Sequence, residues 1–318
     1  MQAVLFNGSL VAVQDHPTPV PRGGEARISV RLAGICSTDL AITQGYKGWH
    51  GVLGHEFTGV VDSVGDPRDS AWIGRRVVGE INVGCGECDR CRAGLQNHCA
   101  RRSALGIYGR DGAFATWCTL PVRNLHAVPE NVSDEAAVFV EPLAAALELL
   151  EQIHIRPDSR AAVVGDGRLG CLAALVLSLS GADVALAGRH PERLALLSSY
   201  GIRPCLCEES FPLVVDCTGS ASGLARARSM LEPRGCLVLK STHTSPPAVD
   251  WARLMVDEIT MIGSRCGPFA PALRLLTTAK VDVTRFIAAT YPLDMAAEAF
   301  RAAHGQLKVL LRPQVFSE

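Results

Sequence analysis

The sequence lacks any marked excess of charge. Its 318 residues include 31 lysines and arginines against 32 aspartates and glutamates, mixed along the chain, for a formal net charge of −1. A nucleic-acid or anionic-membrane partner would need a basic face to hold it. The composition therefore predicts neither kind of partner.

Long hydrophobic runs are also absent. No stretch of eighteen or more apolar residues occurs, so a membrane span is not expected. The N-terminal residues MQAVLFNGSLVAVQDHP contain no basic segment followed by a long apolar core, which argues against a signal peptide. Both absences predict a protein of the cytoplasm.

Cysteine, in contrast, is plentiful, with twelve residues. Disulfides stabilise small secreted domains, but a chain of this length can bury a core without them. Seven of the cysteines lie scattered in apolar or strand-like segments: Cys118, Cys171, Cys205, Cys207, Cys217, Cys236 and Cys266. Reduced thiols together with a metal site fit this distribution better than disulfides, which again favours the cytosol.

Two hydrophobic patterns divide the chain. Residues 1 to about 140 hold short apolar runs between glycine turns, such as EARISVRLAGIC, which predict a β-rich, barrel-like domain. From about residue 143, apolar strands alternate with helical segments. The strands predicted there are AAVVG, VALAG, LVVDCTG, GCLVLK and ITMIG, and the helices include LGCLAALVLSLSG and ASGLARARSMLE. This alternation predicts an α/β domain with a parallel, doubly wound sheet.

A glycine-rich motif opens this second half. The first predicted strand runs into Gly165-Asp166-Gly167-Arg168-Leu169-Gly170, and a helix follows. Such a G-x-G-x-x-G turn between strand and helix is typical of dinucleotide binding, although a plain glycine-rich turn is the alternative. Gly165 allows the tight turn, Gly167 lets the backbone approach the pyrophosphate, and Gly170 lets the helix pack on the sheet. The helix N-terminus then receives the phosphate charge.

The end of the next strand bears on the choice of cofactor. An NAD site usually offers an acid there, about 20 residues after the glycines. This strand instead ends in Gly188-Arg189-His190. Because a guanidinium can bind a 2′-phosphate bidentately, Arg189 predicts a preference for NADP(H) over NAD(H). The alternative is that Arg189 is a solvated loop residue.

Four cysteines are concentrated in residues 84–99, which read GCGECDRCRAGLQNHC. Cys85, Cys88, Cys91 and Cys99 have the spacing C-x2-C-x2-C-x7-C. Bacterial iron–sulfur runs usually place the fourth cysteine after three residues and before a proline, and this segment does neither. Four convergent thiolates suit a closed tetrahedral zinc site. Because such a site has no open coordination position, we expect a structural zinc that orders a lobe with little core of its own.

A second, dispersed set of residues could hold another zinc. Cys36 ends an apolar strand, Gly54-His55-Glu56 begins another run, and Glu141-Pro142 precedes the first long helix. Cysteine, histidine and glutamate all bind zinc, and a zinc with an open position acts as a Lewis acid on an alcohol or carbonyl oxygen. Each residue also has a plain interpretation, as a buried thiol, a turn histidine and a helix-start acid. Spacing alone leaves both interpretations open.

The ordered set of motifs resembles the zinc-dependent medium-chain alcohol dehydrogenase family. In chain order the motifs are Cys36-x-x-Asp39, Gly54-His55-Glu56, the four-cysteine lobe, Glu141-Pro142-Leu143 and the glycine turn, with VVDCTGS at 214–220 and GSRCGPF at 263–269. The resemblance implies a GroES-like, β-rich catalytic domain over residues 1–145, with the structural zinc lobe at about 84–100. It also implies a Rossmann domain over 146–265 and a C-terminal segment, 266–318, that returns to the catalytic domain. The active site would lie between the two domains.

The resemblance also assigns roles to the dispersed residues. Cys36, His55 and Glu56 would bind a catalytic zinc. Glu141 would be a fourth or exchangeable ligand, as in the branch that includes polyol, threonine and glucose dehydrogenases. Asp39 would hydrogen-bond the zinc-bound His55 and so fix its tautomer.

Thr38 would pass on the proton of the substrate, and its alternative role is that of a plain cap or turn threonine. Many relatives continue this relay with a histidine shortly after the Cys-x-x-Asp segment. The matching residues here are Leu40-Ala41-Ile42, so the resemblance does not supply the relay beyond Thr38.

These observations predict a zinc-dependent oxidoreductase with two zinc ions per chain. It would transfer a hydride between an alcohol or polyol, or its carbonyl, and NADP(H), with Thr38, Asp39 and Glu56 in the catalytic machinery. The cysteine lobe often supports subunit contacts in relatives, so a homodimer or homotetramer is expected. Two alternatives remain: a zinc-free type of quinone or enoyl reductase, whose members lack the ligand set, and a non-catalytic NADP(H)-binding regulatory protein.

Overall fold

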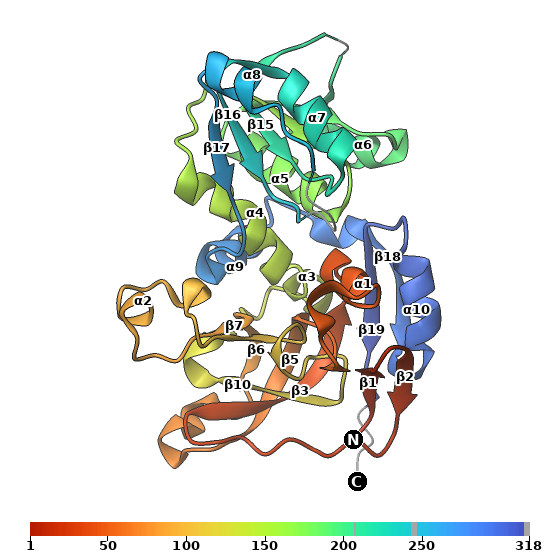
Figure 1. The fold of residues 1–318 in the computed structure, drawn as a ribbon. Helices are drawn as coiled ribbons and strands as arrows, with labels where there is room; N and C mark the ends of the chain where they lie inside the picture. The colour runs from red at the N-terminus through yellow and green to blue at the C-terminus, as the bar shows by residue number, and fades with distance from the viewer. Residues whose placement is uncertain (207, 243–246, 315–318) are drawn as a thin grey trace. The chain divides into compact units, whose positions relative to one another are not determined.

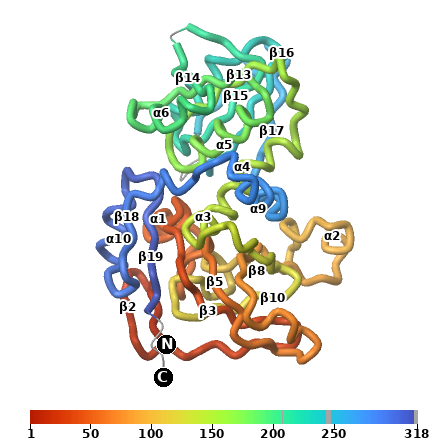
Figure 2. The backbone as a smooth tube through the Cα atoms, turned by 180° about the vertical axis from the view of Figure 1, so that it is seen from behind, coloured from red at the N-terminus to blue at the C-terminus, as the bar shows by residue number. Residues whose placement is uncertain are grey.

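The computed structural model describes residues 1–206, 208–242 and 247–314. The chain forms two compact units, one of Met1–Glu141 with Phe269–Glu318 and one of Pro142–Pro268. Figures 1 and 2 show that the first unit contains strands from both ends of the chain, coloured red and blue. Of the helices described, none is both long and apolar enough to cross a membrane.

A mixed sheet is the centre of the first unit. Its described strands follow the order β11 (Leu125–Ala127), β6 (Arg76–Gly79), β5 (Glu56–Val64), β3 (Glu25–Gly34), β19 (Lys308–Arg312) and β18 (Ile287–Pro292), and β10 (Trp117–Pro121) also pairs with β3. In β3 the apolar residues alternate with polar ones, so that Ala26, Ile28 and Val30 are all buried on one face. Strand β19 comes from the end of the chain and pairs directly with β3.

Smaller elements complete this unit. Two three-stranded sheets contain β2 (Leu10–Val13), β1 (Ala3–Phe6) and β4 (Gly51–Val52), and β7 (Asn82–Val83), β8 (Ser103–Leu105) and β9 (Gly109–Arg110). The helices are α1 (Ser37–Ile42), α2 (Asp89–Arg92), α3 (Asp134–Ala137), α9 (Phe269–Thr277) and α10 (Ala296–Ala303). Helix α10 buries Ala296, Ala299, Phe300 and Ala303, the helical spacing of one apolar face. Phe300 meets the buried Phe114 edge-on, with ring centroids 5.8 Å apart.

The second unit is built on a parallel sheet. Its described strands follow the order β14 (Arg203–Pro204), β13 (Asp183–Ala187), β12 (Arg160–Val164), β15 (Phe211–Asp216), β16 (Leu231–Leu239) and β17 (Thr260–Gly263), and every neighbouring pair is parallel. Strand β12, which comes first in the chain among these six, lies in the middle of the sheet, and the later strands lie on both sides of it. This confirms the predicted doubly wound α/β arrangement.

Helices connect the strands of this sheet. They are α4 (Val140–Gln152), α5 (Arg168–Leu179), α6 (Pro191–Leu197), α7 (Ala221–Ser229) and α8 (Trp251–Val256). Strand β14 and helix α8 were not predicted, because two residues and six residues are too short for a periodic pattern. The helix predicted over 221–232 is too long, since α7 ends at Ser229 and Leu231 begins β16. Pro233, which has no N–H to donate, disfavours helix at its own position and at the one before it.

Candidate metal, catalytic and dinucleotide sites

The pairing of two strands gathers the dispersed zinc ligands. Antiparallel β3 and β5 place Gly34 opposite Glu56. Cys36 follows the end of β3 at the N-cap of α1, and His55 immediately precedes β5. Ligand atoms of Cys36, His55 and Glu56 consequently lie within 4.8 Å of one another.

The carboxylate of Asp39 contacts both Cys36 and His55. One carboxylate oxygen accepts the backbone N–H of Cys36 at 2.8 Å. The other faces Nδ1 of His55 at 3.3 Å, as an ionic contact whose angles are poor for a hydrogen bond. Both side chains are buried, so Asp39 fixes the ring and leaves Nε2 as the second nitrogen of His55.

The cluster attracts positive charge. Burial by itself opposes protonation of His55, but the negative charges of Asp39 and Cys36 outweigh it and hold the pKa of His55 well above its usual value. A thiolate, an imidazole and a carboxylate are also the donor set that Zn²⁺ prefers. The described residues therefore fit a zinc ion here in both charge and chemistry.

Glu56 has a partner that the sequence did not reveal. Its Oε2 forms an ion pair with Nζ of Lys308 on β19, and both side chains are about 1% exposed. The ammonium also lies 5.5 Å from the centroid of the Phe139 ring. A Cβ at residue 34 would stand 2.7 Å from that Oε2, so Gly34 makes room for the pair. The signal that was missed is a lysine in the apolar strand KVLLR.

Glu141 lies close to the same charges but is not among the three mutually close ligands. It occupies the first turn of α4 and is partly buried. Loss of solvation raises the pKa of Glu141 to about 7, with His55 and Lys308 opposing the rise and Glu56 adding to it. Its role as a fourth or exchangeable ligand stays a prediction.

Thr38 is the second residue of α1 and is partly buried. The helix N-cap, Cys36, is two residues before it, so the hydroxyl belongs to the same short turn as the thiolate ligand. The helix terminus thus combines one candidate ligand, the carboxylate of Asp39 and one candidate proton carrier.

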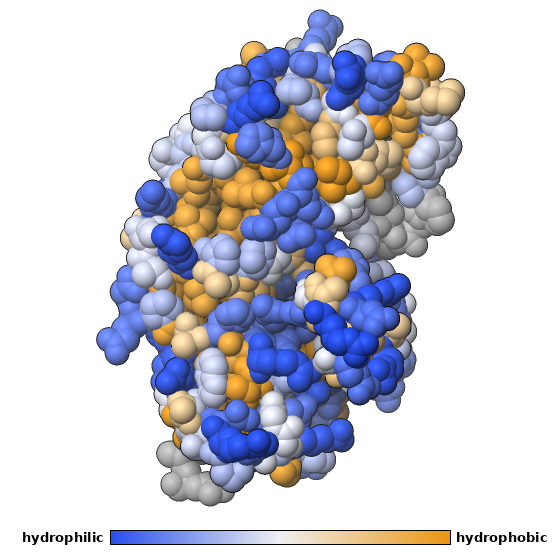
Figure 3. Space-filling view, turned by 90° about the vertical axis from the view of Figure 1, so that its left-hand side faces the viewer, coloured by the Kyte–Doolittle hydropathy of each residue, from blue (hydrophilic) through white to orange (hydrophobic). Residues whose placement is uncertain are grey.

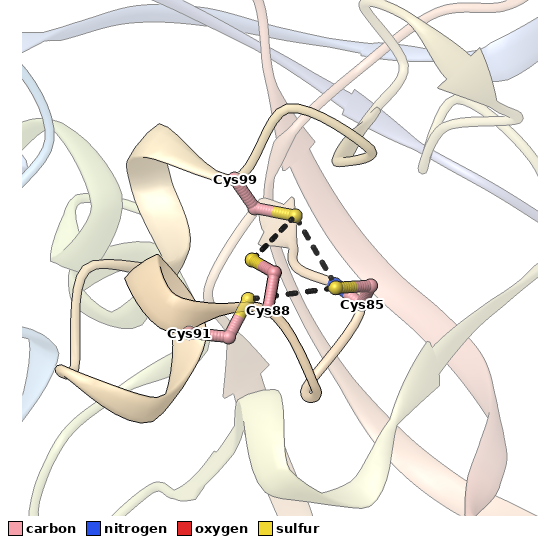
Figure 4. A group of neighbouring side chains, drawn as sticks. All are labelled: Cys85, Cys88, Cys91 and Cys99. Atoms are coloured by element: carbon pink, nitrogen blue, oxygen red, sulfur yellow. Dashed lines mark hydrogen bonds between the residues drawn. The ribbon is translucent and has the colours of Figure 1, made fainter.

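The four cysteines of the lobe converge on one point (Figure 4). Their sulfurs lie within 4.8 Å of one another, with Cys85 and Cys91 at 3.9 Å and Cys88 and Cys99 at 3.8 Å. Backbone N–H groups of Glu87 and Cys88 lower the pKa of Cys85 to about 6. A thiolate is thereby favoured, which is the form that binds a metal.

The lobe has almost no other means of support. The four cysteines of the lobe form no disulfide, so disulfides do not hold it. From residue 85 to residue 98 every side chain is exposed or only partly buried. Binding of zinc would supply the missing cross-links among Cys85, Cys88, Cys91 and Cys99.

The glycine turn joins β12 to α5. Gly165 has a φ of +107°, which favours glycine, and a Cβ on Gly170 would lie 1.8 Å from the carbonyl oxygen of Gly165. A Cβ on Gly167, the N-cap of α5, would meet nothing within 4 Å. Arg168 and Leu169 begin the helix. The turn therefore combines tight helix packing with open space before the helix N-terminus, the arrangement that a phosphate group needs.

Asp166 is a residue of this turn that sequence reasoning passed over. Its carboxylate accepts the backbone N–H groups of Arg189 at 2.8 Å and His190 at 2.7 Å, and pairs with the His190 ring at 3.0 Å. Burial opposes the charged form of Asp166, but these contacts outweigh it and lower its pKa. Arg193 also lies 3.7 Å away. The end of β13 is thus tied to the glycine turn, which orients the segment that carries Arg189.

Comparisons with known proteins agree with these sites. Residues 22–130 match the family model of the alcohol dehydrogenase GroES-like domain, which confirms the predicted character of the β-rich unit. An L-threonine 3-dehydrogenase of Chelativorans sp. (strain BNC1) is 30% identical over 270 residues, 77% of this chain and 78% of that protein.

Two solved structures share the complete fold. An alcohol dehydrogenase of E. coli CFT073, complexed with NADH, is 27% identical with a TM-score of 0.89, covering 98% of this chain and 99% of its own. A zinc-binding dehydrogenase of Sinorhizobium meliloti 1021, bound to NADP, is 26% identical with a TM-score of 0.88, covering 98% and 99%. Both nicotinamide cofactors therefore occur among proteins similar to this chain.

Metal content will show whether both clusters hold zinc. We expect about two zinc ions per wild-type chain and about one in each of Cys36→Ala and Cys91→Ser, because each change removes one ligand of a single cluster. Elemental analysis of dialysed protein measures this directly. Cys205→Ser, which removes a thiol outside both clusters, should keep both ions. One zinc in both the wild type and Cys36→Ala would contradict a metal at the Cys36 cluster.

Proposed function

Because this chain belongs to the zinc-type medium-chain alcohol dehydrogenase family, in the branch with polyol and threonine dehydrogenases, we propose that it is a zinc-dependent dehydrogenase that uses NADP(H). Its substrate would be a small alcohol or polyol, or the corresponding carbonyl compound. The observation that carries the proposal is the convergence of Cys36, His55 and Glu56 above the buried carboxylate of Asp39.

The chemistry divides between the metal and the protein. Zinc held by this cluster would act as a Lewis acid on the substrate oxygen. Asp39 holds Cys36 and His55 in place, and Lys308 holds Glu56. These contacts keep the carboxylate and the imidazole from turning away from the metal position.

The reaction is balanced by the cofactor. In the oxidation direction a bound NADP⁺ would supply the acceptor for the hydride that leaves as the carbinol C–H bond breaks. The O–H bond also breaks, and the hydroxyl of Thr38 receives that proton while releasing its own toward solvent. The products are the carbonyl compound, NADPH and one proton.

The exposed guanidinium of Arg189 supports the choice of NADP(H). Arg189 and His190 follow β13, and Arg193 lies in α6, so all three belong to the segment beside the glycine turn. Asp166 engages His190 and Arg193, while Arg189 is exposed. A 2′-phosphate on the adenosine ribose would therefore meet the Arg189 guanidinium, the group suited to bind it.

We also propose that the chain forms a homo-oligomer through the second unit. Strand β17 ends the order of the described sheet, and the nearby helix α8 exposes Trp251, Met255 and Val256, each more than two-thirds exposed. Figure 3 views the side that carries β17 in Figure 1, and apolar side chains gather across it. An open sheet edge beside such side chains favours pairing with a second copy.

Removal of the Thr38 hydroxyl tests the proton step. In a screen of small alcohols and polyols with NADP⁺, we expect Thr38→Ala to lower kcat about 100-fold while both zinc ions stay bound. Thr43→Ala is the matched control, because that hydroxyl donates to the Leu40 carbonyl at the other end of α1. If Thr38→Ala keeps full turnover, the hydroxyl does not carry the proton.

Arg189→Ala tests the cofactor preference. We expect kcat/KM for NADP⁺ to fall about 100-fold and that for NAD⁺ to change less than about threefold, because only the first loses a charge-assisted contact. Arg156→Ala, another exposed arginine of the second unit, should change neither. Equal efficiency with both cofactors in the wild type, unaltered by Arg189→Ala, would refute the preference.

Met255→Asp tests the oligomer. Sedimentation of the wild type should give a dimer or tetramer, and a buried charge in the interface should shift the variant toward the monomer. Val20→Asp, at an apolar residue that is 81% exposed on the first unit, should leave the state unchanged. A wild type that sediments as a monomer at micromolar concentration would overturn the proposal.

A further inference from the structure

Lys240 is a buried cation outside the zinc clusters. Among the described residues, two lysines are buried, Lys308 at 1% exposure and Lys240 at 8%. Lys308 is matched to the carboxylate of Glu56. Lys240 belongs to the second unit and has no part in the reaction as derived so far. Burying an ammonium is costly, so its position calls for an explanation.

The backbone places Lys240 at the edge of the sheet where ligands bind. It directly follows β16, and its N–H donates to the carbonyl of Asp216 at the end of β15. The N–H of Cys217, the residue after that strand, donates in turn to the carbonyl of Val164 at the end of β12. Lys240 therefore lies at the carboxyl ends of the strands, the same edge as the glycine turn.

The side chain is held in one place by neighbouring elements. Its Nζ donates to the carbonyl oxygen of Ala145 in α4 and to the hydroxyl of Ser264 at 3.0 Å. Ser264 follows β17 and is itself anchored, since its N–H donates to the Leu239 carbonyl. The ammonium is thus fixed between β16, β17 and the early part of α4.

The charge of Lys240 affects the pKa values of neighbouring ionisable groups. Burial raises the pKa of Cys217 to about 12, and the Lys240 charge opposes that rise. Loss of solvation also raises the pKa of Glu148, and Lys240 again opposes it. The charge of Lys240 therefore acts at the end of β15 as well as on α4.

The two halves of a doubly wound sheet receive the two halves of a dinucleotide. Here the glycine turn and the end of β13 take the adenosine side, so β15, β16 and β17 are left for the nicotinamide side. Lys240 follows the middle strand of that second set. This position places a fixed positive charge on the nicotinamide side of the sheet.

We propose that Lys240 is a specificity-determining residue that makes the protein bind reduced cofactor in preference to oxidised cofactor. The inference rests on the proposed function. The nicotinamide ring carries one positive charge in NADP⁺ and none in NADPH, so a nearby ammonium raises the free energy of the oxidised complex only. Replacing Lys240 leaves Glu148 and the other surrounding charges in place, so the change in relative affinity between wild type and variant reports the Lys240 charge. NADPH is thereby bound more tightly than NADP⁺.

The test compares the dissociation constants of NADP⁺ and NADPH for zinc-loaded protein, by calorimetry and by the fluorescence of bound NADPH. In Lys240→Met, which keeps the length of the side chain, we expect the ratio Kd(NADP⁺)/Kd(NADPH) to fall about tenfold, the scale of one unit charge in a partly screened interior. Lys240→Arg keeps the charge and should keep the ratio. Ser264→Ala removes one hydrogen bond of the ammonium and should also keep it.

The outcomes separate this inference from the proposed function. A ratio that is unchanged in a Lys240→Met protein of normal secondary structure would overturn the inference alone. So would a fall of equal size in Lys240→Met and Lys240→Arg, since that would assign the effect to packing. If the wild type binds neither NADP(H) nor NAD(H), the proposed function itself fails. Should Lys240→Met not fold, the Lys240→Arg and Ser264→Ala pair still decides, because a shifted ratio with the charge retained contradicts the role of charge.

Discussion

The antiparallel pairing of β3 with β5 is the contact on which the candidate metal cluster of Cys36, His55 and Glu56 depends. Its register sets Gly34 against Glu56 and so brings the turn that holds Cys36 beside His55. A shift by one residue would reverse the faces of both strands and disperse the ligands. Burial of Glu56 then requires a cation, which β19 supplies through Lys308. The ligand set, its carboxylate partner and the order of three strands are therefore one structural arrangement.

Local sites could be predicted from the sequence, and distant partners could not. The cysteine lobe and the glycine turn each occupy a short segment, so spacing alone carries their geometry, and the alternation of strands and helices gave the correct fold class. Lys308 lies 252 residues from Glu56, and no local pattern connects them. Asp166 was passed over for a related reason, because its partners on Arg189, His190 and Arg193 lie 23 or more residues away in the chain.

Buried charge marks most of what the sequence concealed. Lys308, Lys240 and Asp166 are each less than a tenth exposed, and each is held by atoms from elsewhere in the fold. Hydrophobic periodicity does not reveal such residues, because a charged residue in a strand is assigned to the solvent-facing side of the sheet. Lys308 begins β19 and Lys240 directly follows β16, so each is a buried charge at the end of an apolar strand and needs a partner.

The first unit is discontinuous, and this has a consequence for how the protein is made. Strand β19 pairs with β3 although it is synthesised after the whole of the second unit. Until residue 308 has been synthesised, Glu56 has no Lys308 to neutralise it, and one side of β3 is an open edge. The second unit, being continuous in sequence, can fold during that interval. The candidate metal cluster of the first unit is thus completed only after β19 has been synthesised, so a chain truncated before residue 308 would carry the candidate ligands Cys36, His55 and Glu56 without the strand that pairs with Glu56.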